Sequence, residues 1–288
     1  MKWSQDDVSP DVEDRRGESG GGRFGGGMKL GLGGFIVLAV LSLIFKKNFF
    51  ALLDGGAAPP SASTTERPNA PPPPGPPDER VRFVSFVVDD VQRTWEKEFA
   101  RGSARYEHAK LVLFRDATRS GCGFAEAAMG PFYCSEDRKV YLDLGFFDEL
   151  RSRFGAPGEF AEAYVIAHEF GHHVQMLLGT EARVHRAMED RPNLRNQLSV
   201  RLELQADCLA GVWAHSTDER QILEKGDVES GLAAAAAVGD DRLQRAGGGR
   251  VNPERWTHGS SRERVEWFRR GLETGSANAC DTFAAPGL

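Results

Sequence analysis

The sequence contains few cysteines, and this scarcity limits the metal chemistry that it offers. Its 288 residues include four, Cys122, Cys134, Cys208 and Cys280, and none of them belongs to a CxxC pair. A zinc site made of cysteine thiolates is therefore disfavoured. The even number suits two disulfide bonds, but these persist only in an oxidising compartment. The location of the chain thus decides what the cysteines do.

The sequence also lacks an excess of positive charge. It has 36 Lys and Arg residues against 42 Asp and Glu residues, which gives a formal net charge of -6. An acidic chain without a basic stripe argues against nucleic-acid binding. Apolar residues make up 40% of the chain and charged residues 27%, as in an ordinary soluble core, and no internal repeat is present. The length gives room for one large domain or two small ones.

Only one long hydrophobic run occurs. Residues 30–45 carry no charge, and the apolar character resumes after Lys46 and Lys47. The run is slightly shorter than the about 20 residues that usually span a bilayer, but lysines at its end can snorkel. A signal peptide fits poorly, because the preceding tail is long and acidic and no cleavage site follows closely. A buried helix also fits poorly, because both flanks look disordered. We therefore expect a transmembrane helix over residues 30–53.

The segments that flank this run have the composition of disordered chain. Residues 1–29 are polar and rich in glycine, which predicts a disordered tail, and the proline-rich residues 54–80 predict an extended linker. Slightly more Lys and Arg residues precede the run than follow it, which places the N-terminus in the cytoplasm. We therefore expect a single-pass protein of the cell membrane whose folded domain, residues 81–288, lies outside the cytoplasm.

The pattern of apolar residues in this domain predicts a mainly α fold with a small β-sheet (α+β). A stripe at helical spacing runs through residues 158–178 (Ala163, Ile166, Phe170, Val174 and Leu177). Short apolar runs predict strands at 111–114 and 140–144. The helices expected besides 158–178 cover residues 81–100, 193–214, 228–244 and 260–272.

The most informative motif is HEFGH at residues 168–172, an HExxH sequence. On a helix, His168 and His172 lie one turn apart on the same face, so both imidazoles can reach one zinc ion. Glu169 lies beside them, close enough to act on a zinc-bound water as general base. Chance matches to HExxH on a solvated helix also occur. The apolar stripe, however, leaves the two histidines on a different strip of the helix.

A catalytic zinc usually has a third protein ligand. The metzincin pattern would continue with Gly and then a His ligand at the positions that Gln175 and Leu178 occupy, so that class is excluded. Glu203 lies 31 residues after His172, and Asp207 follows one helical turn later. Glu203 would bind zinc, and Asp207 would accept the second N–H of a ligand histidine. A solvated acidic pair is the alternative, but apolar and small residues surround these two carboxylates.

A candidate for transition-state stabilisation lies near the last predicted helix. His258 precedes this helix in the sequence THGSS, and Arg264 follows six residues later. Near the zinc they would stabilise the oxyanion of a tetrahedral intermediate. A helix cap followed by surface charges explains the same residues equally well. The strand at 140–144 would pair with an extended substrate backbone.

Several blocks of the chain resemble the neutral zinc metallopeptidase family of bacteria. They are HEFGHHVQ, ELQADCLAGVWA, GDD, THGSSRERVEWFRRG, GPFYCSEDRKVYLDLGFF, CDTF and the N-terminal MKW and VEDRRG. The resemblance implies a zincin-like domain behind a membrane anchor. A more distant similarity is to the Ste24 and HtpX peptidases, in which a glutamate is the third ligand. Those relatives carry proline where this chain has Gly259, so this resemblance does not assign a role to His258.

The predicted location gives two alternatives for the cysteines. If the domain lies outside the cytoplasm, Cys122 pairs with Cys134 and Cys208 pairs with Cys280. The second bridge would then tie the C-terminal tail to the helix that carries Glu203 and Asp207, and would contribute about 4 kcal/mol. If the domain is cytoplasmic, all four are buried thiols.

We therefore expect a zinc metallopeptidase with one Zn²⁺ per chain that acts on a protein or peptide substrate, and no binding of nucleic acid. One alternative is a zinc amidase acting on cell-wall or small amide substrates. Another is a non-catalytic binding module stabilised by zinc. The last would need a fourth protein ligand and would have no use for Glu169.

Overall fold

A computed structural model describes residues 1–4, 7–17, 78–102, 104–126, 130–152, 155–156, 158–246 and 251–284. The predicted transmembrane helix over 30–53 and most of the predicted linker lie outside these residues. The end of that linker is helical, because α2 already begins at Glu79. None of the helices in the described ranges has the length and apolar character that crossing a membrane requires.

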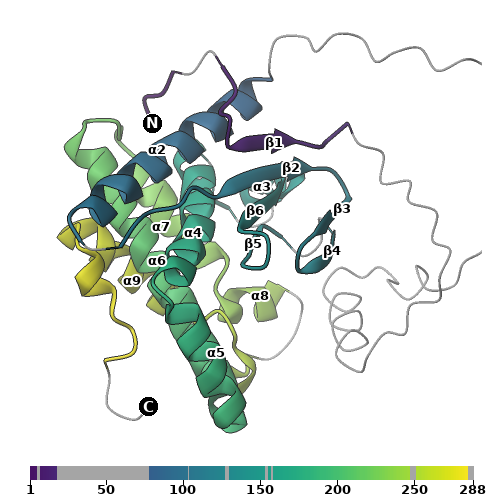
Figure 1. Cartoon of the computed structure of the whole chain (residues 1–288), viewed down its shortest axis with the longest axis vertical. Helices are drawn as coiled ribbons and strands as arrows, with labels where there is room; N and C mark the ends of the chain where they lie inside the picture. Colours follow the sequence, from purple (N-terminus) through teal and green to yellow (C-terminus); the bar gives the residue numbers. More distant parts are fainter. Residues whose placement is uncertain are drawn as a thin grey trace, which may run out of the picture. The chain divides into compact units, whose positions relative to one another are not determined.

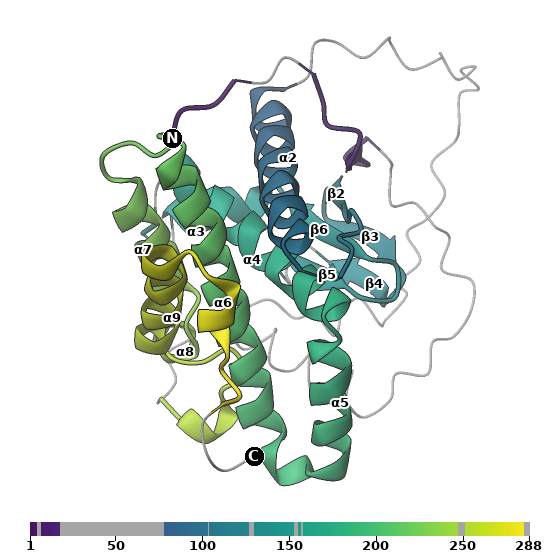
Figure 2. The same ribbon diagram turned by 60° about the vertical axis from the view of Figure 1, so that its left-hand side comes forward.

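The described part of the chain is mainly helical, and it has the small sheet that the sequence predicts. Two helices, α2 (Glu79–Ala100) and α4 (Glu159–Leu177), lie between the sheet and the other long helices (Figures 1 and 2). Beyond them lie α6 (Arg195–Glu219), α7 (Asp227–Ala237) and α9 (Ser261–Thr274). The remaining described α-helices are α3 (Gly145–Ser152), α5 (Thr180–Asp190) and α8 (Asp240–Ala246).

The main sheet has four strands in the order β1 (Val12–Asp14), β2 (Lys110–Phe114), β6 (Lys139–Asp143) and β5 (Phe132–Cys134). The first three are parallel, and β5 is antiparallel to β6. Strand β6 is therefore paired on both sides, so the prediction that the strand at 140–144 receives a substrate backbone is wrong. Strand β5 is the edge on that side. A separate hairpin consists of β3 (Ala117–Ser120) and β4 (Gly123–Glu126).

The N-terminal residues are part of this fold. The prediction of a disordered tail is wrong for residues 1–4 and 7–17, because β1 extends the sheet and pairs with β2. The Trp3 ring packs edge-on against Phe83 of α2, with 5.4 Å between centroids, and Val12 is buried. The glycine-rich composition that suggested disorder comes mostly from residues after position 17. The folded domain thus combines residues 1–17 with the chain from residue 79 onward.

Glycines allow the helices around α6 to approach one another closely. A Cβ atom at Gly271 of α9 would lie 1.9 Å from the carbonyl oxygen of Cys208, and one at Gly211 of α6 would lie 2.1 Å from that of Phe268. A Cβ at Gly171 of α4 would lie 3.0 Å from the carbonyl oxygen of Ala206. Because no side chain separates the backbones, residues of α4 and α9 reach the same part of α6.

The helix predicted over 228–244 is in fact two helices, α7 and α8, which break at Val238 and Gly239. Gly239 packs against the backbone of Ser261, where a Cβ would be only 2.4 Å from the amide nitrogen. The amide of Asp240 donates to the carbonyl oxygen of Gly259 at 2.9 Å. The break therefore brings the GDD sequence at 239–241 against the THGSS segment at 257–261.

Candidate metal centre

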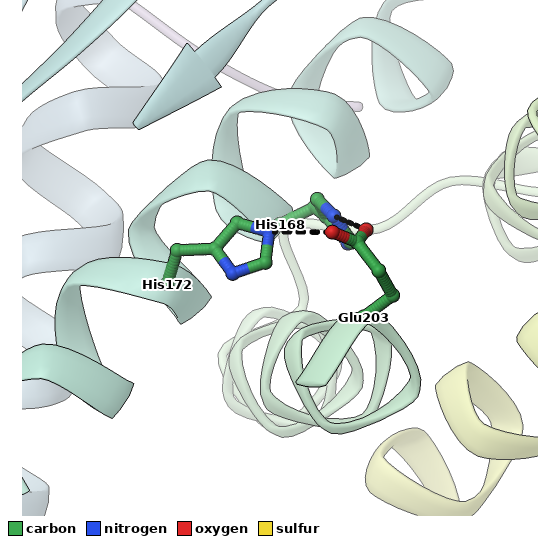
Figure 3. A group of neighbouring side chains, drawn as sticks. All are labelled: His168, His172 and Glu203. Carbon is green, nitrogen blue, oxygen red and sulfur yellow. Dashed lines mark hydrogen bonds and ion pairs between the residues drawn. The ribbon is translucent and has the colours of Figure 1, made fainter. Parts of the chain in front are cut away.

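Helices α4 and α6 bring the three predicted metal ligands together. His168 and His172 project from α4 toward Glu203 of α6, and one possible ligand atom from each lies within 4.8 Å of the others (Figure 3). The Nε2 atom of His168 is 3.2 Å from one carboxylate oxygen of Glu203, and that of His172 is 3.6 Å from the other. Both imidazoles thus present the same nitrogen to one point.

The charge of this group fits a divalent cation. Burial raises the pKa of Glu203, but His172 and His168 outweigh it and hold this pKa well below its usual range. Burial lowers the pKa of His168, but Asp207 and Glu203 raise it to about 9, so a bound cation would displace a proton from this imidazole. An ionised carboxylate between two imidazoles is a donor set typical of zinc, with three protein ligands and room for a fourth. The residues present therefore fit the ion that the sequence motif implies.

Asp207 lies one turn after Glu203 and orients His168. Its carboxylate accepts a hydrogen bond from Nδ1 of His168 at 2.9 Å, which leaves Nε2 directed at Glu203. Tyr164 donates its hydroxyl to the same carboxylate. Hydrogen bonding at the far nitrogen fixes the tautomer and the ring orientation of a ligand histidine. The structure thus gives Asp207 the contact that the sequence predicts.

Arg264 of α9 pairs with Asp207 and lies behind His168. Its Nε and a terminal nitrogen donate to the two carboxylate oxygens at 2.8 Å and 2.9 Å, and both side chains are buried. A terminal nitrogen also lies 3.3 Å from Nδ1 and 3.5 Å from Nε2 of His168. Because Asp207 engages the donors of this guanidinium, the structure does not place Arg264 as the oxyanion donor that its distance from His258 in the sequence suggested. It acts on the metal centre through Asp207.

Gln175 is a partner of the metal centre that sequence reasoning missed. Its side-chain oxygen accepts from Nδ1 of His172 at 2.9 Å, as Asp207 does for His168. The spacing carried a signal, because Gln175 follows His172 by three residues and so lies on the same helical face. In the sequence this position served only to exclude a metzincin.

Glu169 is 8% exposed, and within the described residues its carboxylate has no hydrogen-bond or ion-pair partner.

His173, which follows His172, is fully buried and points away from Glu203. It contacts the Tyr133 hydroxyl of β5 at 2.9 Å and the carbonyl oxygen of Glu107 at 2.6 Å. His173 therefore joins α4 to the edge of the sheet and is not a ligand.

His258 lies on a loop that Asp240 shapes. One carboxylate oxygen of Asp240 accepts from three consecutive backbone amides, those of Thr257, His258 and Gly259, at 2.8, 2.6 and 3.0 Å. The other oxygen is 3.4 Å from Nδ1 of His258. The loop rests on α6, where Ser199 donates to the Thr257 carbonyl oxygen at 2.9 Å. The imidazole is half exposed and lies within electrostatic reach of Glu203.

Both disulfide pairings expected for an oxidising compartment are present. Cys122 is bonded to Cys134, which links the β3–β4 hairpin to β5. Cys208 of α6 is bonded to Cys280 in the 3-10 turn η5 (Ala277–Cys280). The second bridge starts at the residue that follows Asp207, so it lies directly beside the metal centre.

Comparison with known proteins identifies the family of the chain. It is 44% identical over 287 residues to "Uncharacterized protein YpfJ" of Escherichia coli (strain K12), covering 98% of this chain and 99% of that protein. It is 46% identical over 194 residues to "Uncharacterized protein Rv2575" of Mycobacterium tuberculosis (strain H37Rv), covering 64% and 65%. No solved structure matches the chain significantly. The family model described as "Putative neutral zinc metallopeptidase" matches residues 1–283, and the chain belongs to this family.

Proposed function

We propose that this protein is a zinc-dependent peptidase in which His168, His172 and Glu203 hold one Zn²⁺. The observation that carries the proposal is the geometry of the two histidines. Each directs Nε2 at the Glu203 carboxylate and has Nδ1 bound by another side chain. This arrangement is typical of zinc sites with an open fourth position. Glu169, adjacent and without a partner in the described residues, supplies the base that such chemistry needs.

A bound zinc ion supplies Lewis acidity, which polarises a carbonyl group and makes water acidic enough to attack at neutral pH. Glu169 accepts the proton of the attacking water and returns it to the leaving amine. Asp207 and Gln175 keep the ligand imidazoles oriented. His258 donates a hydrogen bond to the oxygen on which negative charge develops.

An extended peptide is the substrate that the sheet favours. Strand β5 is the edge of the main sheet nearest α4, and in the described residues no strand pairs with its outer side. A peptide in extended conformation would add to this edge through backbone hydrogen bonds. This favours peptide hydrolysis over the alternative, a zinc amidase acting on cell-wall or small amide substrates. A purely structural zinc site would leave Glu169 without a role.

Zinc should control cleavage of an unfolded protein. We expect the full chain to cleave casein, to lose this activity after dialysis against a chelator, and to regain it when zinc is restored. Magnesium serves as the control, because its preference for six oxygen ligands does not fit two imidazoles. Cleavage that survives complete removal of zinc would contradict the proposal. Zinc binding without cleavage of any peptide would favour the amidase or the binding module.

The pH dependence of cleavage should report on His258. Burial lowers the pKa of His258, but Asp240 and Glu203 raise it above 6.5 against the opposing charge of Arg264. The imidazolium is lost as the pH rises through this raised pKa. We therefore expect an alkaline limb in the pH profile, along which kcat/KM falls. Asp240→Asn should move this limb to lower pH.

The neighbouring carboxylate provides a matched control for this measurement. Asp241 accepts from the amide of Ser261 at 2.7 Å instead of contacting His258. Asp241→Asn should therefore leave the alkaline limb where it is. A limb that stays in place in Asp240→Asn would remove His258 from the mechanism.

We also propose that residues 30–53 attach the protein to a membrane. The fold limits its geometry, because β1 pairs with β2 and residues 1–17 therefore lie on the same side of a membrane as the rest of the domain. A cytoplasmic N-terminus with the domain outside would separate these two strands. Cell fractionation tests this attachment by comparing the full chain with a chain that lacks residues 30–53. We expect only the full chain to sediment with membranes.

A further inference from the structure

The hydrogen bonds of Gln175 have only one possible direction. This side chain is 2% exposed, and its amide nitrogen lies 2.7 Å from the backbone carbonyl oxygen of Leu202. A carbonyl oxygen only accepts, so the NH₂ group of Gln175 must face Leu202. The side-chain oxygen of Gln175 is thereby left to face Nδ1 of His172, which must carry the proton. The lone pair of Nε2 in His172 is then free for a metal.

A second glutamine repeats this logic one step further from the metal. The amide nitrogen of Gln175 also donates to the side-chain oxygen of Gln205 at 3.1 Å. The amide nitrogen of Gln205 in turn donates to the backbone carbonyl oxygen of Cys280 at 3.0 Å. A fixed acceptor again determines the direction of the amide. The order of donors and acceptors thus runs without conflict from the Cys280 carbonyl to His172.

The segment that supplies this carbonyl is attached to α6 on both sides of Gln205. Cys280 forms the disulfide bond with Cys208, and both residues are buried. Thr282 donates its hydroxyl to the carbonyl oxygen of Arg201 at 2.7 Å. Positions 201, 205 and 208 lie on one face of α6, because they are spaced by four and three residues. The carbonyl of Cys280 is therefore held over Gln205 by a covalent bond and a hydrogen bond.

We propose that Gln175 and Gln205 are positioning residues that fix the tautomer of His172, and that the Cys208–Cys280 disulfide maintains this arrangement. The C-terminal segment around Cys280 then belongs to the metal centre, although it supplies no ligand. The inference rests on the proposed zinc site, and it makes zinc affinity depend on a disulfide bond. It does not depend on which amide bond the enzyme hydrolyses.

Zinc affinity measured by competition with a chromophoric chelator tests this inference without any activity assay. We expect Gln175→Met to weaken zinc binding by about 10- to 100-fold, the usual effect of removing a partner of a ligand histidine. Gln205→Met and the double variant Cys208→Ala/Cys280→Ala should weaken it in the same direction but less, because both act through Gln175. Circular dichroism would establish that each metal-free variant is folded.

Two matched variants separate positioning from general stability. Gln92 is also a buried glutamine, but it bonds Asp11 and the amide of Ala109, away from the zinc ligands. Gln92→Met should lower thermal stability and leave zinc affinity unchanged. The other disulfide offers the same control through Cys122→Ala/Cys134→Ala.

The outcomes distinguish this inference from the function on which it rests. Zinc affinity that falls in the Gln175, Gln205 and Cys208/Cys280 variants but not in the controls supports the inference. Equal affinity in all folded variants overturns it while the zinc site stands. Affinity that falls equally in the controls also overturns it, because the effect is then one of stability. A wild-type chain that binds no zinc would overturn both the inference and the proposed function.

Discussion

Replacement of Glu169 by glutamine is expected to abolish peptide hydrolysis while zinc remains bound. Glutamine has the same shape as glutamate but cannot take a proton from the attacking water. General bases contribute about 10²- to 10⁴-fold to rate, so kcat/KM for a fluorogenic peptide should fall by about that factor. Zinc affinity should stay within a few-fold of the wild type, because neither metal-directed nitrogen contacts Glu169 in the structure.

An exposed glutamate serves as the control for this substitution. Glu189 lies at the surface of α5, so Glu189→Gln should leave both kcat/KM and zinc affinity unchanged. If Glu169→Gln kept activity within ten-fold of the wild type, Glu169 would not be the base. If the variant lost zinc together with activity, the loss of activity would say nothing about proton transfer.

Replacement of Asp207 by alanine should have the largest effect on stability. The variant leaves the Arg264 guanidinium buried without its carboxylate, and the side chain of Arg264 is 3% exposed. Breaking one side of a buried ion pair usually costs about 3–5 kcal/mol of folding free energy. We expect a loss of this size in urea unfolding. Zinc binding should weaken as well, because His168 loses the acceptor for Nδ1.

A double variant separates the two effects of Asp207. Asp207→Ala/Arg264→Met removes both charges, so no unpaired ion stays buried, and much of the lost stability should return. The weakened zinc affinity should not return, because His168 still lacks its acceptor. The interpretation fails if the two substitutions are simply additive in stability, or if the double variant binds zinc like the wild type.

Helical spacing was sufficient to predict which candidate ligands share a helix face. His168 and His172 are four residues apart, as are Glu203 and Asp207, and each pair lies on a long helix that the sequence predicts. Within one helix, spacing alone determines which side chains share a face. The sequence could therefore predict the two pairs of side chains, and the structure places the two helices so that the pairs meet.

Helical spacing could not predict contacts between segments that are distant in the sequence. Arg264 contacts Asp207 because two glycines allow α6 and α9 to pack closely, and no local sequence pattern predicts this packing. Gln205 gains its role only from the carbonyl of Cys280, which is distant in sequence. The strand order likewise depends on long-range pairing, so β6 was mistaken for an edge strand. Strand β1 was missed because three residues are too few for a periodic signal.

Zinc titration of the metal-free full chain tests the central claim most directly. The structure predicts one equivalent bound per wild-type chain, and strongly weakened binding in His168→Ala, His172→Ala and Glu203→Ala. His185→Ala is the control, because His185 is an exposed histidine of α5. A wild-type chain that takes up no zinc, or a ligand variant that binds it as tightly as the wild type, would contradict the assignment of these three residues as the metal centre.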